Sequence, residues 1–157
     1  MTSIAELLFT HPRFKEREHW VRRSYPENTV VITEGECGKE LFIVIRGTVR
    51  VTGNIELEGG STVHPGVCDL GADAVFGEFG VLTHNLRTAT VTTVTECELA
   101  VIDGDRLHEF FETHSRIGYQ VMLEILETVA ERLTRTNRKM LTLLAWGLKR
   151  HDIERHL

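Results

Sequence analysis

The segment from Phe76 to Val91 carries the residue types with the clearest chemistry in this sequence. Gly77 and Gly80 stand on either side of an acid, Glu78, and a lone arginine, Arg87, precedes a threonine-rich stretch. Glycine lets backbone N–H groups come close to a ligand, and the N-terminus of a short helix points such groups at an anion. Arginine presents a planar fork to a phosphate, and a carboxylate accepts hydrogen bonds from sugar hydroxyls. An anion site beside a hydroxyl acceptor is what a ribose phosphate requires.

The same residues also fit a simpler arrangement. Arg87 and Glu78 would form an ordinary surface ion pair, and the glycines would only make a turn. A glycine beside an acid is a weak motif, so the spacing alone favours the ion pair.

No motif in the sequence indicates catalysis. A metal-dependent β-barrel enzyme of the cupin type needs converging histidines, but His64 and His84 are solitary and no His-x-His pair exists. Nucleophile elbows, Walker phosphate loops and zinc-protease helices are absent from the sequence. We therefore expect neither an enzyme nor a metal site.

The residues around this segment predict strands. From about 25 to 103 the chain is rich in β-branched residues and is punctuated by glycines. Many short strands with glycine turns indicate a β-roll or jelly-roll barrel, so the expected fold is mainly β with flanking helices. The phosphate-binding segment, residues 76–89, lies inside this region.

Helices are expected on both sides of the β-region. Residues 1–24 read as short helices broken at Pro12, with Phe14 to Arg23 as the second. In the C-terminal region, 104–157, Asp103 is a plausible N-cap, and a long helix is predicted from about Tyr119 to about Arg150. Its apolar residues alternate four and three apart, as in a coiled coil. This stripe either packs along the chain's own β-region or, as we favour, pairs in a homodimer.

Composition sets further limits. The net charge of −5 lowers the expectation of a nucleic-acid surface. Three widely spaced cysteines form no disulfide framework and fit a reduced, cytoplasmic protein. No apolar run is long enough to span a bilayer, and the N-terminus does not read as a signal peptide.

The sequence resembles the cyclic-nucleotide-binding domain family, which includes the bacterial cAMP receptor protein, kinase regulatory subunits and nucleotide-gated channels. The resemblance rests on Phe76-Gly77-Glu78 followed by Arg87-Thr88-Ala89, the two parts of the family's phosphate-binding cassette. The stretches 31–36 and 40–47 also look like the family's first strands and turn. This chain departs from the usual pattern at Phe79, commonly a smaller aliphatic residue, and at Gly80, commonly alanine.

The resemblance implies a role for each matching residue. Arg87 would pair with the cyclic phosphate, while Glu78 and the backbone of Gly77 would hold the ribose 2′-hydroxyl. Backbone N–H groups around Thr88 and Ala89 would complete the phosphate cradle. Phe76 and Phe79 belong to the same segment, and Phe79 would shape the pocket wall.

The base is less clearly specified. The family's long helix carries a polar pair that contacts adenine, and alignment places Thr136 and Asn137 there; these two residues could equally set dimer register. Thr88 is also found in members that respond to cGMP. We favour cAMP as the ligand, with cGMP as the alternative.

The expected function is a cytoplasmic cyclic nucleotide sensor that transmits binding through its C-terminal helices. Only seven residues follow the long helix, so DNA binding by this chain is not expected, and neither is membrane binding; a protein effector is unidentified. Two alternatives stay open: a regulatory fragment of a larger enzyme, channel or transcription factor, and a scaffold that keeps the fold without a ligand.

Overall fold

The structure is a computed structural model that describes residues 2–63, 66–82 and 86–150. The chain divides into two compact units, Met1–Val121 and Met122–Leu157. The first unit holds all the strands and the shorter helices. The described residues of the second are the distal part of the long helix.

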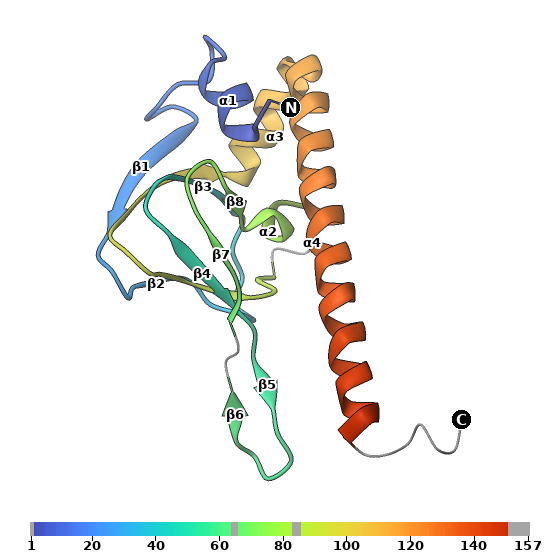
Figure 1. Ribbon diagram of the computed structural model, residues 1–157. Helices are drawn as coiled ribbons and strands as arrows, with labels where there is room; N and C mark the ends of the chain where they lie inside the picture. The colour runs from blue at the N-terminus through green and yellow to red at the C-terminus, as the bar shows by residue number, and fades with distance from the viewer. Residues whose placement is uncertain (1, 64–65, 83–85, 151–157) are drawn as a thin grey trace. The chain divides into compact units, whose positions relative to one another are not determined.

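Two antiparallel four-stranded sheets form the first unit (Figure 1). The order in one sheet is β1-β10-β3-β8, and the order in the other is β2-β9-β4-β7. A short hairpin, β5-β6, extends from the roll. The strands are β1 (Trp20–Tyr25), β2 (Val30–Ile32), β3 (Glu40–Arg46), β4 (Val49–Thr52), β5 (Ile55–Glu56), β6 (Thr62–Val63), β7 (Gly66–Leu70), β8 (Val75–Phe76), β9 (Thr90–Thr93) and β10 (Cys97–Asp103).

This arrangement confirms the expected β-roll and corrects the expectation of a barrel. In the described ranges no strand pairing joins the two sheets, so the roll is open. An apolar core fills it, because alternate residues of β3 and β10 face inward. Its buried members are Phe42, Val44, Val49, Phe76, Val91, Cys97, Leu99 and Val101.

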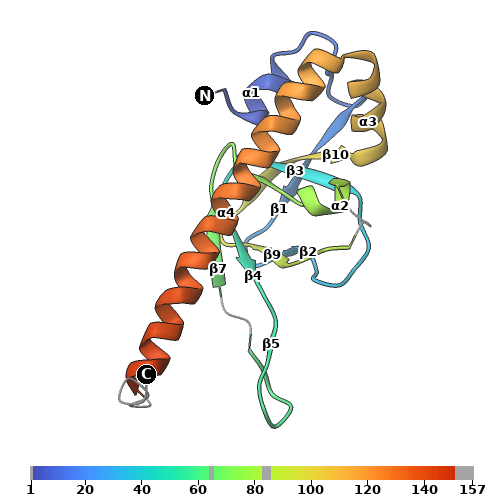
Figure 2. The same cartoon turned by 90° about the vertical axis from the view of Figure 1, so that its right-hand side faces the viewer.

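The central strands β3 and β10 are buried on both faces. Leu41 and Ile43 point away from the inner core, yet both are fully buried, as is Ile102 of β10. Helices supply the cover on this outer face, where buried Leu8 of α1 (Ile4–Phe9) and Leu107 of α3 (Gly104–Thr113) lie. Figures 1 and 2 show α1 and α3 at the same end of the roll.

One predicted element is wrong. The sequence pattern predicted a helix from Phe14 to Arg23, but Trp20–Tyr25 is the edge strand β1, paired antiparallel with β10. The hydrogen-bonding edge of β10 is a long-range partner that local pattern cannot reveal. Tertiary pairing therefore overrides the local preference.

The start of α3 follows from capping. Asp103 is confirmed as an N-cap, because its carboxylate accepts hydrogen bonds from the backbone N–H groups of Asp105 and Arg106 at 3.0 and 3.1 Å. The long helix α4 runs without interruption over Ser115–Arg150, so it begins earlier than expected. Among the described helices, none is long and apolar enough to cross a membrane.

Candidate functional site

The backbone of the cassette turns sharply between a strand and a short helix. Strand β8 ends at Phe76, and Gly77 follows with a φ of +80°, a conformation that favours glycine. The helix α2 (Glu78–Leu82) begins at the next residue. Phe76 anchors the turn, since its ring stacks on Phe42 of β3 with centroids 4.9 Å apart.

Arg87 is held by a second stretch of backbone. Its N–H donates to the carbonyl of Glu36, and its carbonyl accepts from the N–H of Gly35, both at 2.9 Å. A bridge between Leu86 and Cys37 continues this pairing. The turn after β2 therefore fixes the direction in which the arginine enters the site.

The Arg87 guanidinium is buried, and both of its terminal nitrogens donate hydrogen bonds. Only 4% of the residue is exposed. Nη1 donates to the carbonyls of Glu40 and Gly77 at 2.9 and 3.3 Å, and Nη2 donates to Glu40 Oε2 at 2.9 Å. The ring of Phe42 lies 5.6 Å from the guanidinium carbon, within cation–π range.

Three glycines make room for this group. A Cβ at Gly38 would lie 2.6 Å from Nη2 of Arg87, and a Cβ at Gly80 would lie 2.6 Å from Nη1. A Cβ at Gly77 would lie 3.0 Å from Nη1. We call Gly38, Gly77 and Gly80 the glycine cradle. Because these three residues have no Cβ, the guanidinium lies directly against their backbone.

Burial and charge act on the arginine in opposite directions. Removal from water lowers the pKa of Arg87, because burial disfavours the charged form, while the carboxylate of Glu40 raises it in part. Glu78, at the first residue of α2, is only 5% exposed. A surface ion pair between Arg87 and Glu78 is therefore wrong, since both residues are buried and Arg87 pairs with Glu40.

The other predicted residues lie at the edge of this cluster or outside it. Thr88 is exposed and Ala89 half-buried, directly after Arg87. Phe79 is 37% exposed on α2, and its role in the pocket wall stays a prediction. Thr136 and Asn137 are exposed positions of α4 in the second unit, and their role at a base stays a prediction.

Two residues of the site had no signal in the sequence. The sequence predicted only a turn at Gly38 and only the start of a strand at Glu40. Both are identified by their distance to Arg87, which depends on the pairing of segments about 47 residues apart.

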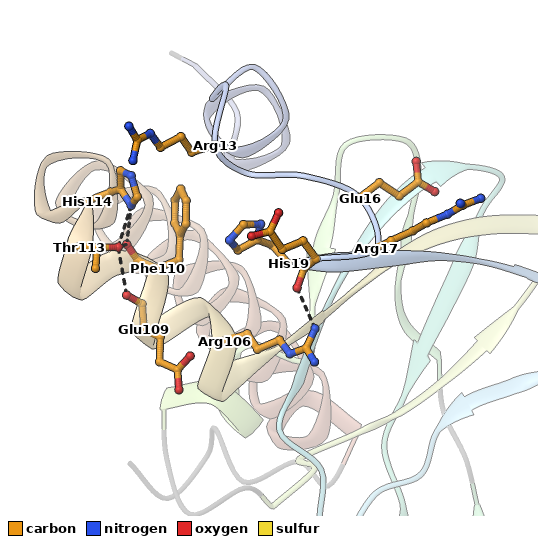
Figure 3. A pocket seen from close by; sticks show the side chains of 10 residues that line it. Arg13, Glu16, Arg17, His19, Arg106, Glu109, Phe110, Thr113 and His114 are labelled. Carbon is orange, nitrogen blue, oxygen red and sulfur yellow. Dashed lines mark hydrogen bonds between the residues drawn. The ribbon is translucent and has the colours of Figure 1, made fainter.

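A separate pocket lies between the segment after α1 and helix α3 (Figure 3). Its volume is about 860 Å³, and Arg106 closes one side by donating to the carbonyl of Glu18 at 2.7 Å. Three arginines and three glutamates line it together with His19 and His114, so its charges do not favour one sign. Among the described residues, no group of histidine, cysteine and acidic side chains could hold a metal ion.

Comparison with known proteins places these features in a family. Residues 22–114 match the family model described as "Cyclic nucleotide-binding domain". The chain is 30% identical over 120 residues to a "CRP-like cAMP-activated global transcriptional regulator" of Mycobacterium tuberculosis, covering 76% of this chain and 50% of that protein. It is 33% identical over 117 residues to the human "Potassium/sodium hyperpolarization-activated cyclic nucleotide-gated channel 2", covering 73% of this chain and 11% of the channel.

A solved structure agrees with the sequence relatives. The "c-di-GMP Responsive Global Regulator CLP" of Xanthomonas campestris matches with a TM-score of 0.70 and 30% identity, covering 80% of this chain and 60% of that one. The chain thus spans about half the length of the bacterial regulator it matches, and these relatives are regulators and a channel rather than enzymes. The matched residues include nine of the ten described strands, most of β1 and the whole cassette with Arg87, and on this evidence the chain belongs to the cyclic nucleotide-binding domain family.

Proposed function

We propose that this chain is a sensor domain that binds cAMP at the cassette. The observation that carries the proposal is the buried guanidinium of Arg87, held in the glycine cradle at the start of β3. Burial of a charged side chain is costly, and it is common where the charge has a ligand to meet. A singly charged cyclic phosphate matches one guanidinium.

The remaining contacts follow from the positions of the neighbouring residues. Glu78 and the Gly77 backbone lie directly beside the strand end that carries Phe76, where they would receive the ribose hydroxyl. The backbone at Thr88 and Ala89 follows Arg87 and would add N–H donors to the phosphate. We assign the base to Thr136 and Asn137 of α4. The mycobacterial relative is a cAMP-activated regulator, which supports adenine over guanine.

Titration calorimetry with cAMP, cGMP and cyclic di-GMP tests the ligand. Arg87→Gln should weaken cAMP binding by about 30-fold to 4,000-fold, the effect of removing one member of a buried charge pair. Arg50→Gln is the matched control, because Arg50 is an exposed arginine that pairs with Asp69 at 2.7 and 2.9 Å on the other sheet. Equal cAMP affinity in wild type and Arg87→Gln would rule out the proposed site, and tighter binding of another nucleotide would reassign the ligand.

We also propose that α4 pairs two copies of the chain and carries the signal to a protein effector. Large apolar side chains recur on one stripe of this helix, and they are exposed: Leu126 by 63%, Leu133 by 60%, Met140 by 51% and Leu143 by 72%. Such a stripe is typical of a coiled-coil interface. Light scattering after gel filtration should give a dimer for the wild type and a monomer for Leu133→Asn. Arg135→Asn, on another side of the helix, should stay dimeric.

The longer relatives keep a second candidate open. Since the matched regulator and channel are about twice and nine times the matched length, a sensor domain within a larger regulated protein fits the same comparisons. A cytoplasmic location is part of the proposal, supported by the free thiols of Cys37, Cys68 and Cys97.

A further inference from the structure

Glu40 is the acidic partner that the sequence did not reveal. Its carboxylate pairs with Nη2 of Arg87 at 2.9 Å, yet the two members of the pair differ greatly in exposure. The arginine side chain is 4% exposed and that of Glu40 is 43% exposed. The carboxylate therefore lies on the solvent side of the pair and covers the guanidinium.

The other contacts of Arg87 divide into fixed and exchangeable ones. The two carbonyls that bind Nη1 belong to the main chain of β3 and of the β8–α2 turn, so they move only with the backbone. The Glu40 carboxylate is at the end of a flexible side chain, and rotation about its bonds releases it into water. An anion arriving from solvent thus meets a guanidinium whose position is set by carbonyls and whose outer side holds a carboxylate.

A carboxylate and a phosphate cannot share this outer side without cost. Two like charges at hydrogen-bond distance from the same nitrogen repel each other. The ion pair is itself weak, because water competes for the half-exposed Glu40 carboxylate. A ligand phosphate that adds further backbone hydrogen bonds can displace it.

We propose that Glu40 is an internal competitor for the anion site, which the phosphate of the ligand displaces from Arg87. The inference rests on the proposed function and deepens it. In the ligand-free protein Glu40 neutralises the buried guanidinium. On binding, its carboxylate turns to solvent, and the loss of the pair subtracts from the affinity. Glu40 thereby sets the concentration of cyclic nucleotide at which the domain responds.

The test is calorimetry with cAMP at fixed pH and ionic strength on three variants. Glu40→Gln removes the charge and keeps the shape, and it should bind cAMP about 3- to 5-fold more tightly, the effect of removing a half-exposed ion pair. Glu40→Asp keeps the charge and should stay within about 2-fold of wild type. Asp69→Asn, in the exposed pair with Arg50 on the other sheet, changes the net charge equally and should leave the affinity unchanged.

Each other outcome is decisive. An unchanged or weaker affinity in Glu40→Gln overturns the inference, and so does an equal gain in Asp69→Asn, which would point to net charge alone. If wild type binds cAMP and Glu40→Gln does not differ, only this inference fails. If neither protein binds any cyclic nucleotide, both the proposed function and the inference fail. Circular dichroism on each variant checks the fold.

Discussion

Gly80 is the position at which this chain departs from alanine in the family pattern, and the structure gives the reason. A Cβ there would overlap the carbonyl oxygen of Gly38 and would lie 2.6 Å from Nη1 of Arg87. Carbon and nitrogen atoms normally approach to about 3.5 Å, so Arg87 or the backbone must give by roughly 1 Å. The predicted change is Gly80→Ala.

Two effects of opposite sign decide how far Gly80→Ala changes the unfolding free energy. Alanine is favoured over glycine in a helix by about 1 kcal/mol, and α2 would gain part of this. Inserting a methyl group into a closed space costs about 1–3 kcal/mol. Because one of the opposing atoms is a backbone carbonyl, which cannot rotate away, we expect the second effect to win. The net loss of unfolding free energy should be about 1–2 kcal/mol, or roughly 2–8 °C in Tm.

Thermal unfolding measures this loss, and calorimetry with cAMP measures the effect on the site. Affinity should fall together with Tm, because the displaced atoms include the guanidinium. Gly147→Ala is the matched control, since Gly147 lies in a helix and a Cβ there would meet nothing within 4 Å. That variant should keep or raise the stability. The reasoning is refuted if Gly80→Ala keeps the wild-type Tm and affinity.

Three further predictions concern the frame around the site. Thr93→Val should lower the unfolding free energy by about 1–3 kcal/mol, measured by urea denaturation, because the fully buried hydroxyl accepts from a backbone N–H at 2.8 Å and donates to a carbonyl at 2.6 Å. Asp103→Ala should cost about 1 kcal/mol by removing the cap of α3. His11 packs beside His114, and burial, His114 and Arg13 lower its pKa. The folded state therefore favours neutral His11, so stability should fall as the pH drops below the ordinary histidine value of 6.5, and thermal melts at stepped pH should show a smaller fall in His11→Gln.

Matched variants distinguish the loss of each assigned hydrogen bond from a general loss of stability. Thr95→Val removes a hydroxyl that accepts from the N–H of Thr48 at 3.0 Å at an exposed position, so it should cost less than Thr93→Val. Asp103→Asn keeps an oxygen for capping and should retain most of the stability. Equal losses in either matched pair would contradict the assigned contacts.

The cassette was predictable from the family resemblance, because the residues that carry it are local. Glycines beside an acid, followed by arginine and threonine, lie within one short stretch of sequence, and the structure confirms a strand end, a glycine turn at Gly77 and a short helix at Glu78. The strand-rich region and its glycine turns likewise predicted the roll. These features depend on residue types and spacing, which a single sequence contains.

The missed features all depend on contacts between distant segments. Strand β1 forms because β10 offers it an edge, although its own sequence does not alternate clearly. Glu40 and Gly38 join the site only when β3 lies beside the β8–α2 turn. The barrel expectation failed for a related reason. Strand content predicts sheets, but the pairing at their edges determines whether they close.

The position of Arg87 also bears on whether the fold has kept a ligand. In a scaffold with no anion to bind, an apolar residue of similar volume would avoid the desolvation of a buried guanidinium, and such replacements of buried ion pairs are often neutral or stabilising. Here the chain instead keeps the arginine, leaves three neighbouring positions without side chains to house it, and covers it with a carboxylate that can rotate away. The burial of the charge costs stability and Gly80 costs helix propensity, while the Glu40 carboxylate neutralises the guanidinium from the solvent side. Glycines that make room for a buried arginine, and a carboxylate that neutralises it, are expected of an anion-binding site without its ligand. This arrangement argues against the scaffold alternative.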